Sequence, residues 1–262
     1  VEELHQMRVA VRRIRAALKA ARPLLDRPWA DGLRAELGWL GRALGPVRDA
    51  DVLIERLRGR AAAFDEFSRD GAGVLINALV AERELARAEM FAALDSDRYT
   101  ALLRKLAAAV SAPLPPQPLL AGEQAPESAL VELVGTEFRR LRKAVRLAGD
   151  NPADEVLHAL RIQGKRLRYT GELAATSGGK PIRKLVASTV ALQDVLGEHQ
   201  DACVAQQRVM ALLGGLGAAA DVHVAFAAGR LVECEEVSRL ATRGTWSAAW
   251  HQVQQQALGL NH

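Results

Sequence analysis

Cysteines, aromatic residues and long apolar runs are all scarce in this sequence. The 262 residues include two cysteines, Cys203 and Cys234, which have neither metal-ligand spacing nor a framework of paired cysteines. A reducing, cytoplasmic setting is therefore expected. No apolar run approaches the roughly 18 residues that a membrane-spanning helix needs, so no membrane partner is expected. The sequence starts inside a helical pattern, without Met or a charged-then-apolar leader, so we expect a trimmed start and no secretion signal.

The low aromatic content, 4%, also limits the fold. Hydrophobic residues make up 49% of the chain, and Ala, Leu, Arg and Glu dominate its long segments. These residues favour helices, whereas the β-branched and aromatic residues that favour strands are sparse. The sequence therefore predicts an all-α protein with Leu, Ala and Val in its core.

Positive charge is unevenly distributed along the chain. The formal net charge is only +4, with a pI of about 9.4, which by itself says little about partners. However, the segment from Leu4 to Leu25 holds six basic residues and no acid, and the segment from Arg139 to Arg146 holds five basic residues in eight positions. Such local density of one sign favours an anionic ligand.

A proline-rich segment divides the chain. Five of the ten prolines lie between Ser111 and Pro126, and prolines this dense prevent a continuous helix. We predict a first half at 1–112, a linker at 113–127 and a second half at 128–262, the two halves together making one domain.

The two halves repeat each other. The run LHQMRVAVRRIR, from Leu4 to Arg15, matches LHALRIQGKRLR, from Leu157 to Arg168. A second match, one residue out of that offset, sets RALGPVRDADVLIERL beside DVLGEHQDACVAQQRV and pairs Gly45 with Gly197. Since matches recur in the same order, we infer an internal duplication, with the halves packed about a pseudo-twofold axis.

Each half is predicted to form about four helices. In the first half, the second helix ends near the Leu44-Gly45 pair and the third starts at Pro46, because Gly and Pro interrupt helices. These helices run from Glu2 to Arg22, Trp29 to Leu44, Pro46 to Asp65 and Val74 to Val110, the last interrupted near Asp95 to Asp97. A further helix from Leu130 to Leu147 precedes the repeat in the second half, whose first helix starts at Asp150 to Glu155 with a capping side chain and acids in the first turn.

The first helix carries an apolar stripe and a basic stripe side by side. At about 100° per residue, the apolar stripe is expected to pack in the core, and the basic stripe lies about 100° around the helix from it. The apolar stripe consists of Leu4, Met7, Val11, Ile14 and Leu18. The basic stripe consists of His5, Arg8, Arg12, Arg15, Lys19 and Arg22. Arg13 is expected to point into solvent.

Like charges at helical spacing repel, so an external anion is expected to neutralise the basic stripe. Arginine suits phosphate, because its planar fork binds two oxygens and keeps its charge. The stripe recurs at His158, Arg161, Lys165 and Arg168. Another follows at Arg139, Arg142, Lys143 and Arg146.

Together these motifs closely resemble the CHAD family, the conserved histidine α-helical domain. The resemblance rests on HxMRVxxRRxR and WLxRxLGxxRDxD in the first half, and on HxLRIxxKRLRY and LQDVLGEHQD in the second. It implies two pseudo-twofold-related four-helix bundles, a basic groove or pore, and non-catalytic binding of inorganic polyphosphate in prokaryotes, with association with polyphosphate granules. The resemblance extends the ligand set to Arg42 and Arg48, although Asp194 and Gln200 replace them in the second copy. It implies no cofactor.

Other interpretations of single residues stay open. His5 and His158 either hydrogen-bond structurally or contact phosphate, since no further metal ligand lies at helical spacing. The carboxylates of Asp49, Asp51 and Asp201 either lie in the first turn of a helix or orient arginines, rather than binding a metal. The glycine at position 164 of a helix is interpreted as allowing close helix contact.

Four other functions compete with polyphosphate binding. An enzyme of phosphate chemistry would need carboxylates holding Mg²⁺ beside the cations, and the densest basic segments contain no acid. A nucleic-acid binder would interleave aromatic residues with its basic groove, which this sequence does not do. A scaffold for acidic proteins, or an accessory module of a phosphate-metabolising enzyme, completes the alternatives. The sequence leaves the oligomeric state open.

Overall fold

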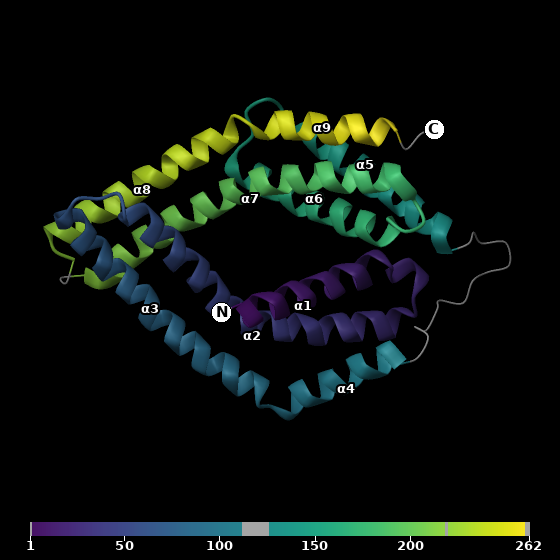
Figure 1. The fold of residues 1–262 in the computed structure, drawn as a ribbon, viewed down its shortest axis with the longest axis horizontal. Coiled ribbons are helices and arrows are strands. Elements are labelled where there is room, and N and C mark those ends of the chain that lie inside the picture. Colours follow the sequence, from purple (N-terminus) through teal and green to yellow (C-terminus); the bar gives the residue numbers. More distant parts are fainter. Residues whose placement is uncertain (1, 112–125, 218–219, 260–262) are drawn as a thin grey trace. The chain divides into compact units, whose positions relative to one another are not determined.

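The computed structural model of the protein describes residues 2–111, 126–217 and 220–259, and this part of the chain is all-α (Figure 1). It forms nine α-helices and no strand, which confirms the predicted fold class. The helices are α1 (Glu2–Ala20), α2 (Arg27–Ala61), α3 (Glu66–Leu94), α4 (Asp97–Ser111), α5 (Pro126–Ala148), α6 (Asp154–Ala174), α7 (Gly179–Leu216), α8 (Val222–Arg243) and α9 (Trp246–Leu258), with a 3-10 turn, η1 (Arg22–Leu24), after α1. No helix in these ranges is long and apolar enough to cross a bilayer.

The predicted helix break at Leu44-Gly45-Pro46 is wrong. Helix α2 runs through Pro46 for 35 residues, and α7 runs through Gly197 for 38 residues. Burial explains the continuity of α2, because Leu44 and Val47 on either side of the proline are 0% and 4% exposed. Packing on both sides offsets the loss of one backbone hydrogen bond at the proline.

Other predicted boundaries fared better. The interruption expected near Asp95 to Asp97 is confirmed, because α3 ends at Leu94 and α4 begins at Asp97. The helix expected to start at Asp150 starts instead at Asp154, and its N-cap, Ala153, provides no side-chain hydrogen bond. The acids expected in its first turn are present, as Asp154 and Glu155.

The chain folds into two compact units that do not coincide with the predicted halves at 1–112 and 128–262. Unit 1 comprises residues 1–8, 40–99 and 198–243, and unit 2 comprises residues 9–39, 100–197 and 244–262. The reason is the continuity of the two long helices, since α2 and α7 each contribute residues to both units. Of the predicted linker, 113–125 lies outside the described residues, and 126 and 127 begin α5. The duplication itself stays a prediction.

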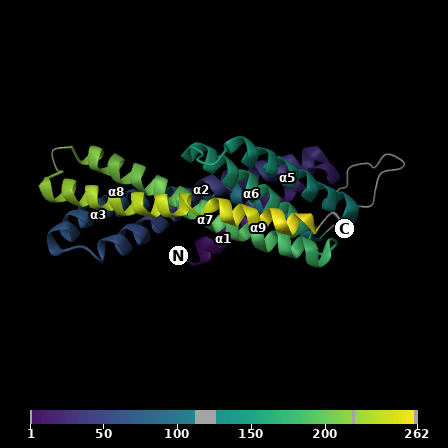
Figure 2. The ribbon, with the colours of Figure 1, turned by 90° about the horizontal axis from the view of Figure 1, so that it is seen from above.

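The core of unit 1 is a cluster of small and branched apolar side chains. These side chains come from α2, α3, α7 and α8, whose ribbons are labelled in Figure 2. Leu57 of α2, Leu75 of α3 and Leu231 of α8 are fully buried in it. Helices α3 and α8 approach closely, because a Cβ added at Gly71 would lie 2.2 Å from the backbone oxygen of His223. The helix pair therefore depends on a residue without a side chain at this position.

We expect Gly71→Ala to destabilise unit 1 by about 2 kcal/mol or more, since the added methyl group meets a backbone that can yield only by separating the two helices. Gly73→Ala is the matched control on the same helix. Nothing lies within 4 Å of a Cβ at Gly73, so this change should raise stability by about 0.5–1 kcal/mol through helix propensity. Urea denaturation of both variants measures the difference, and equal midpoints would contradict the close approach of α3 and α8.

Unit 2 has a separate core built on α5, α6, α7 and α9. Val134 and Leu141 of α5 pack with Leu160 and Leu167 of α6, and Trp250 of α9 is 4% exposed in the same cluster. Helices α5 and α6 therefore pack against each other (Figure 1). This packing fixes the directions in which their polar faces point.

Candidate functional site

Helix α1 presents its basic stripe largely as predicted, but its apolar stripe is narrower. Val11 and Leu18 are each 6% exposed, whereas Leu4 and Met7 are only half-buried. Ile14, predicted to be a core residue, is 37% exposed. Arg12, Arg13, Arg15 and Lys19 are all exposed, so the C-terminal part of α1 offers a cationic surface.

Two arginines of α1 rest against glycines of α2. A Cβ at Gly45 would lie 3.0 Å from Nη1 of Arg8, and a Cβ at Gly38 would lie 3.4 Å from Nη2 of Arg15. Arginines and glycines are both seven residues apart, or two helical turns. The missing side chains at Gly38 and Gly45 therefore make room for guanidinium groups.

A similar contact occurs on α6, which carries the second copy of the motif. A Cβ at Gly197 of α7 would lie 3.8 Å from Nε of Arg161. The sequence repeat pairs Arg161 with Arg8 and Gly197 with Gly45, so the arginine-on-glycine arrangement occurs at both matched positions. Nε of Arg161 is buried and has no hydrogen-bond partner. By contrast, Gly164 is not required for close contact, because a Cβ there would sit at an ordinary 3.5 Å from Gln193.

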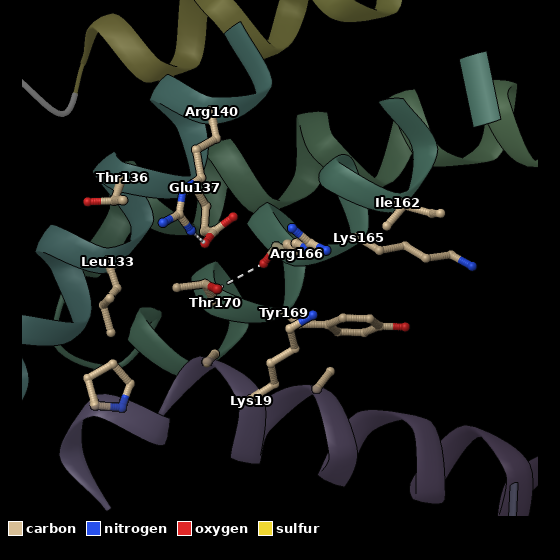
Figure 3. Close-up of a pocket in the computed structure, with 13 residues that line it drawn as sticks. Lys19, Leu133, Thr136, Glu137, Arg140, Ile162, Lys165, Arg166, Tyr169 and Thr170 are labelled. Atoms are coloured by element: carbon tan, nitrogen blue, oxygen red, sulfur yellow. Dashed lines mark hydrogen bonds and ion pairs between the residues drawn. The ribbon is translucent and has the colours of Figure 1, made fainter. Parts of the chain in front are cut away.

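A pocket of about 410 Å³ lies between α1, α5 and α6 of unit 2 (Figure 3). Lys19 extends from α1 across to α6, and Lys165, Arg166 and Tyr169 extend from α6. Arg140 enters from α5. Four cationic side chains from three helices therefore meet at one opening, two of them at positions predicted from the motif, Lys19 and Lys165.

The electrostatics of the pocket are dominated by positive charge. Burial lowers the pKa of the Lys19 ammonium below its usual value, and the nearby charges of Arg166 and Arg34 lower it further. The carboxylate of Glu137 acts in the opposite direction, but it is already paired with Arg140 at 2.5 Å. A lysine whose charge is disfavoured by its neighbours would be stabilised by a bound anion.

Like Arg8, which pairs with Asp49, two further predicted ligands have acidic partners in place of the expected free charge. Nη2 of Arg22 donates to Asp31 at 2.7 Å, which together with its other hydrogen bonds to Asp31 raises the pKa of the guanidinium. Nε of Arg168 donates to Glu172 at 2.7 Å. An anion could reach these two arginines only in competition with a carboxylate, because each is held in an ion pair.

The remaining predicted ligand residues lie in three separate places. His5, Arg8, Arg42 and Arg48 belong to unit 1, where His5 and Arg48 are half-buried and Arg42 is exposed. Arg139, Arg142, Lys143 and Arg146 are exposed on α5 and line a different pocket from that of Figure 3. His158 is half-buried on α6.

Asp49 and Asp51 each orient an arginine, which was one of the two interpretations left open. Nη2 of Arg8 donates to Asp49 at 2.7 Å, and Nη1 of Arg83 donates to Asp51 at 3.4 Å. The other interpretation, a position in the first turn of a helix, is wrong for both aspartates, because α2 begins at Arg27. It is wrong for Asp201 as well, which lies well inside α7.

Two cationic residues of this site were missed by the motif analysis. Arg166 was matched only to Arg13, which points into solvent, yet Arg166 lines the pocket. Arg140 carries no motif signal, because it joins the site through helix packing rather than through spacing along α1 or α6. Tyr169 is 9% exposed, and its ring borders the pocket.

Comparison with known proteins gives a consistent result. The CHAD domain family model matches residues 1–210. Two proteins of Mycobacterium tuberculosis, the uncharacterized proteins MT2285 of strain CDC 1551 / Oshkosh and Rv2226 of strain H37Rv, are each 31% identical over 225 residues, which is 80% of this chain and 40% of theirs. This chain thus spans less than half the length of these relatives. The solved structure of PptA from Streptomyces chartreusis superimposes with a TM-score of 0.78 at 22% identity, over 95% of this chain and 89% of PptA.

Proposed function

We propose that this chain, which belongs to the CHAD domain family, binds inorganic polyphosphate and does not catalyse a reaction on it. Its family links it to polyphosphate, and no side-chain arrangement described above resembles a nucleophile with its base. The proposal places the protein in the cytoplasm, associated with polyphosphate granules.

The observation that carries the proposal is the convergence of cations in the α1–α5–α6 pocket. Lys19, Lys165 and Arg166 come from two helices that carry the repeated motif, and Arg140 joins them from a third. Partial burial, followed by the charges of Arg166 and Arg34, lowers the pKa of Lys19, so a ligand with many negative charges relieves a cost already present in the folded protein. A chain of phosphates supplies that charge with oxygens suited to arginine forks and ammonium groups.

The exposed cations of α1 and α6 extend the proposed site beyond the pocket. Arg12 and Arg15 precede Lys19 on α1, and seven residues correspond to about 10.5 Å along the helix. A polyanion longer than a few phosphates could therefore contact both the pocket and this part of α1. We propose that affinity grows with chain length for this reason.

Two alternatives to polyphosphate binding compete with this proposal. A nucleic acid carries the same phosphate charge, but the pocket borders a single aromatic side chain, Tyr169, and single-stranded nucleic acids are usually held by several. An accessory role within a larger phosphate-metabolising enzyme is compatible with the relatives, since the chain covers 40% of their length. The first alternative is tested below, and the second requires the full-length protein.

The test is calorimetric titration of the protein, at about 150 mM salt, with long-chain polyphosphate, tripolyphosphate and duplex DNA at equal total charge. We expect long-chain polyphosphate to bind at least tenfold more tightly than either competitor. DNA binding as tightly as polyphosphate would show a generic polyanion surface and contradict the proposal. Incubation of long chains with Mg²⁺ and measurement of released phosphate would reveal an enzyme instead.

A further inference from the structure

We infer that unit 2 contains a second, separate phosphate-binding site, formed by the four exposed cations of α5 and the edge of α9. The motif analysis grouped these cations with those of α1 and α6, but the structure separates them. Arg139, Arg142, Lys143 and Arg146 line a pocket of about 400 Å³ together with Trp250 and Gln254, and none of the four borders the pocket of Figure 3.

The separation follows from the geometry of α5. At about 100° per residue, the face that carries Leu133, Glu137 and Arg140 is about 140° around the helix from the face that carries these four cations. The core residues Val134 and Leu141 hold α5 in this orientation, since both are 0% exposed. One helix therefore presents basic side chains to two different openings.

The chemistry of the second site favours inorganic phosphate. Among the ion pairs of the described residues none involves Arg139, Arg142, Lys143 or Arg146, whereas Arg140 on the other face is paired with Glu137. Nη2 of Arg139 donates to the hydroxyl of Thr136 at 3.0 Å, and the guanidinium of Arg142 lies 5.8 Å from the ring centre of Phe138. Both contacts order an arginine without neutralising it.

The aromatic floor of this site is unsuited to a nucleobase. Trp250 is only 4% exposed, and its ring already stacks on Phe138, with ring centres 5.9 Å apart and planes at 23°. A base would have to displace Phe138 to stack there. The cations are accessible and the indole is not, so the site fits an oligophosphate rather than a single-stranded nucleic acid.

Two phosphate-binding sites on different faces of α5 would make the protein bivalent for a long polyphosphate chain. A helix with its side chains is about 10–12 Å across, so a phosphate chain that leaves one opening is held close to the other. The second contact is then intramolecular and raises affinity without any change in the first. This inference rests on the proposed function only for the choice of ligand.

The experiment counts bound tripolyphosphate ions per chain by calorimetry, because this ligand is too short to occupy both sites. We expect the double variant Arg142→Ser with Arg146→Ser to bind one ion fewer than the wild type and to bind long-chain polyphosphate about tenfold more weakly. The variant Arg183→Ser with Lys184→Ser is the control, since it removes the same charge from an exposed stretch of α7, and its ion count should match the wild type.

The outcomes separate the two proposals. An unchanged ion count in the α5 variant, with binding retained, would overturn the second site and leave the proposed function standing. A wild type that binds neither tripolyphosphate nor long chains would overturn both. A control variant that also loses one ion would show diffuse charge rather than a site. Circular dichroism of both variants should match the wild type, because all four substituted residues are exposed.

Discussion

Replacing Lys19 and Arg166 together with serine is expected to weaken the binding of long-chain polyphosphate by about 100-fold, the largest effect on binding anticipated for any pair of residues. Each side chain is expected to make charge-assisted contacts with phosphate worth about 1.5–3 kcal/mol, and the two lie on helices that face each other across the pocket. The salt dependence should also flatten, with the slope of log affinity against log salt decreasing by about 1.4. Titrations at several salt concentrations measure both quantities.

The control for this variant is again Arg183→Ser with Lys184→Ser on α7, which should shift affinity less than threefold. A shift as large as that of the pocket variant would mean that net charge, not the pocket, determines binding. Lys19→Arg provides a second check. Because the pKa of Lys19 is lowered, its ammonium loses its proton at a lower pH than an ordinary lysine, and the wild type should lose affinity for polyphosphate there. Arginine keeps its charge, so Lys19→Arg should abolish that loss.

Replacing Glu235 with alanine is expected to destabilise unit 1 by about 3–5 kcal/mol, the largest effect on stability anticipated for a single substitution. The side chain of Glu235 is 0% exposed, and it accepts hydrogen bonds from Arg56 at 2.8 Å and from Arg60 at 3.0 Å. Burial alone would lower the pKa of Arg56, but the hydrogen bonds with Glu198 and Glu235 raise it above its usual value. Without Glu235, only Glu198 would remain to balance the partly buried charge of Arg56.

The exposed Glu233 on the same helix is the matched control, and Glu233→Ala should change stability by less than about 0.5 kcal/mol. Thermal and urea denaturation measure both variants. If Glu235→Ala has the same melting temperature as the Glu233→Ala control, solvent reaches Arg56 more freely than its 15% side-chain exposure indicates.

Sequence periodicity predicted the features of this protein that depend on one helix alone. Val11 and Leu18 of α1 were correctly placed in the core, because their spacing follows from 3.6 residues per turn. The ligand role of the basic stripe stays a prediction. The all-α fold class followed from composition. The interruption before Asp97 was also predicted from the local sequence.

Features that depend on contacts between helices were not predictable in this way. Gly45 and Pro46 indicate a helix break by propensity, but the buried residues on both sides of Pro46 outweigh that preference. Arg140 joins the site because helix packing brings α5 to it. The same holds for the partition into units, which follows from two long continuous helices rather than from the proline-rich segment.

The glycines beneath Arg8 and Arg15 bear on the entropy of binding. A free arginine side chain samples many rotamers, and fixing it costs up to about 2 kcal/mol. A guanidinium that already rests over Gly38 or Gly45 has given up part of that freedom before a ligand arrives. Lysine at either position would keep the charge but lack the planar group that fills the gap. Replacing Arg8 or Arg15 with lysine should therefore appear in calorimetry chiefly as a less favourable binding entropy.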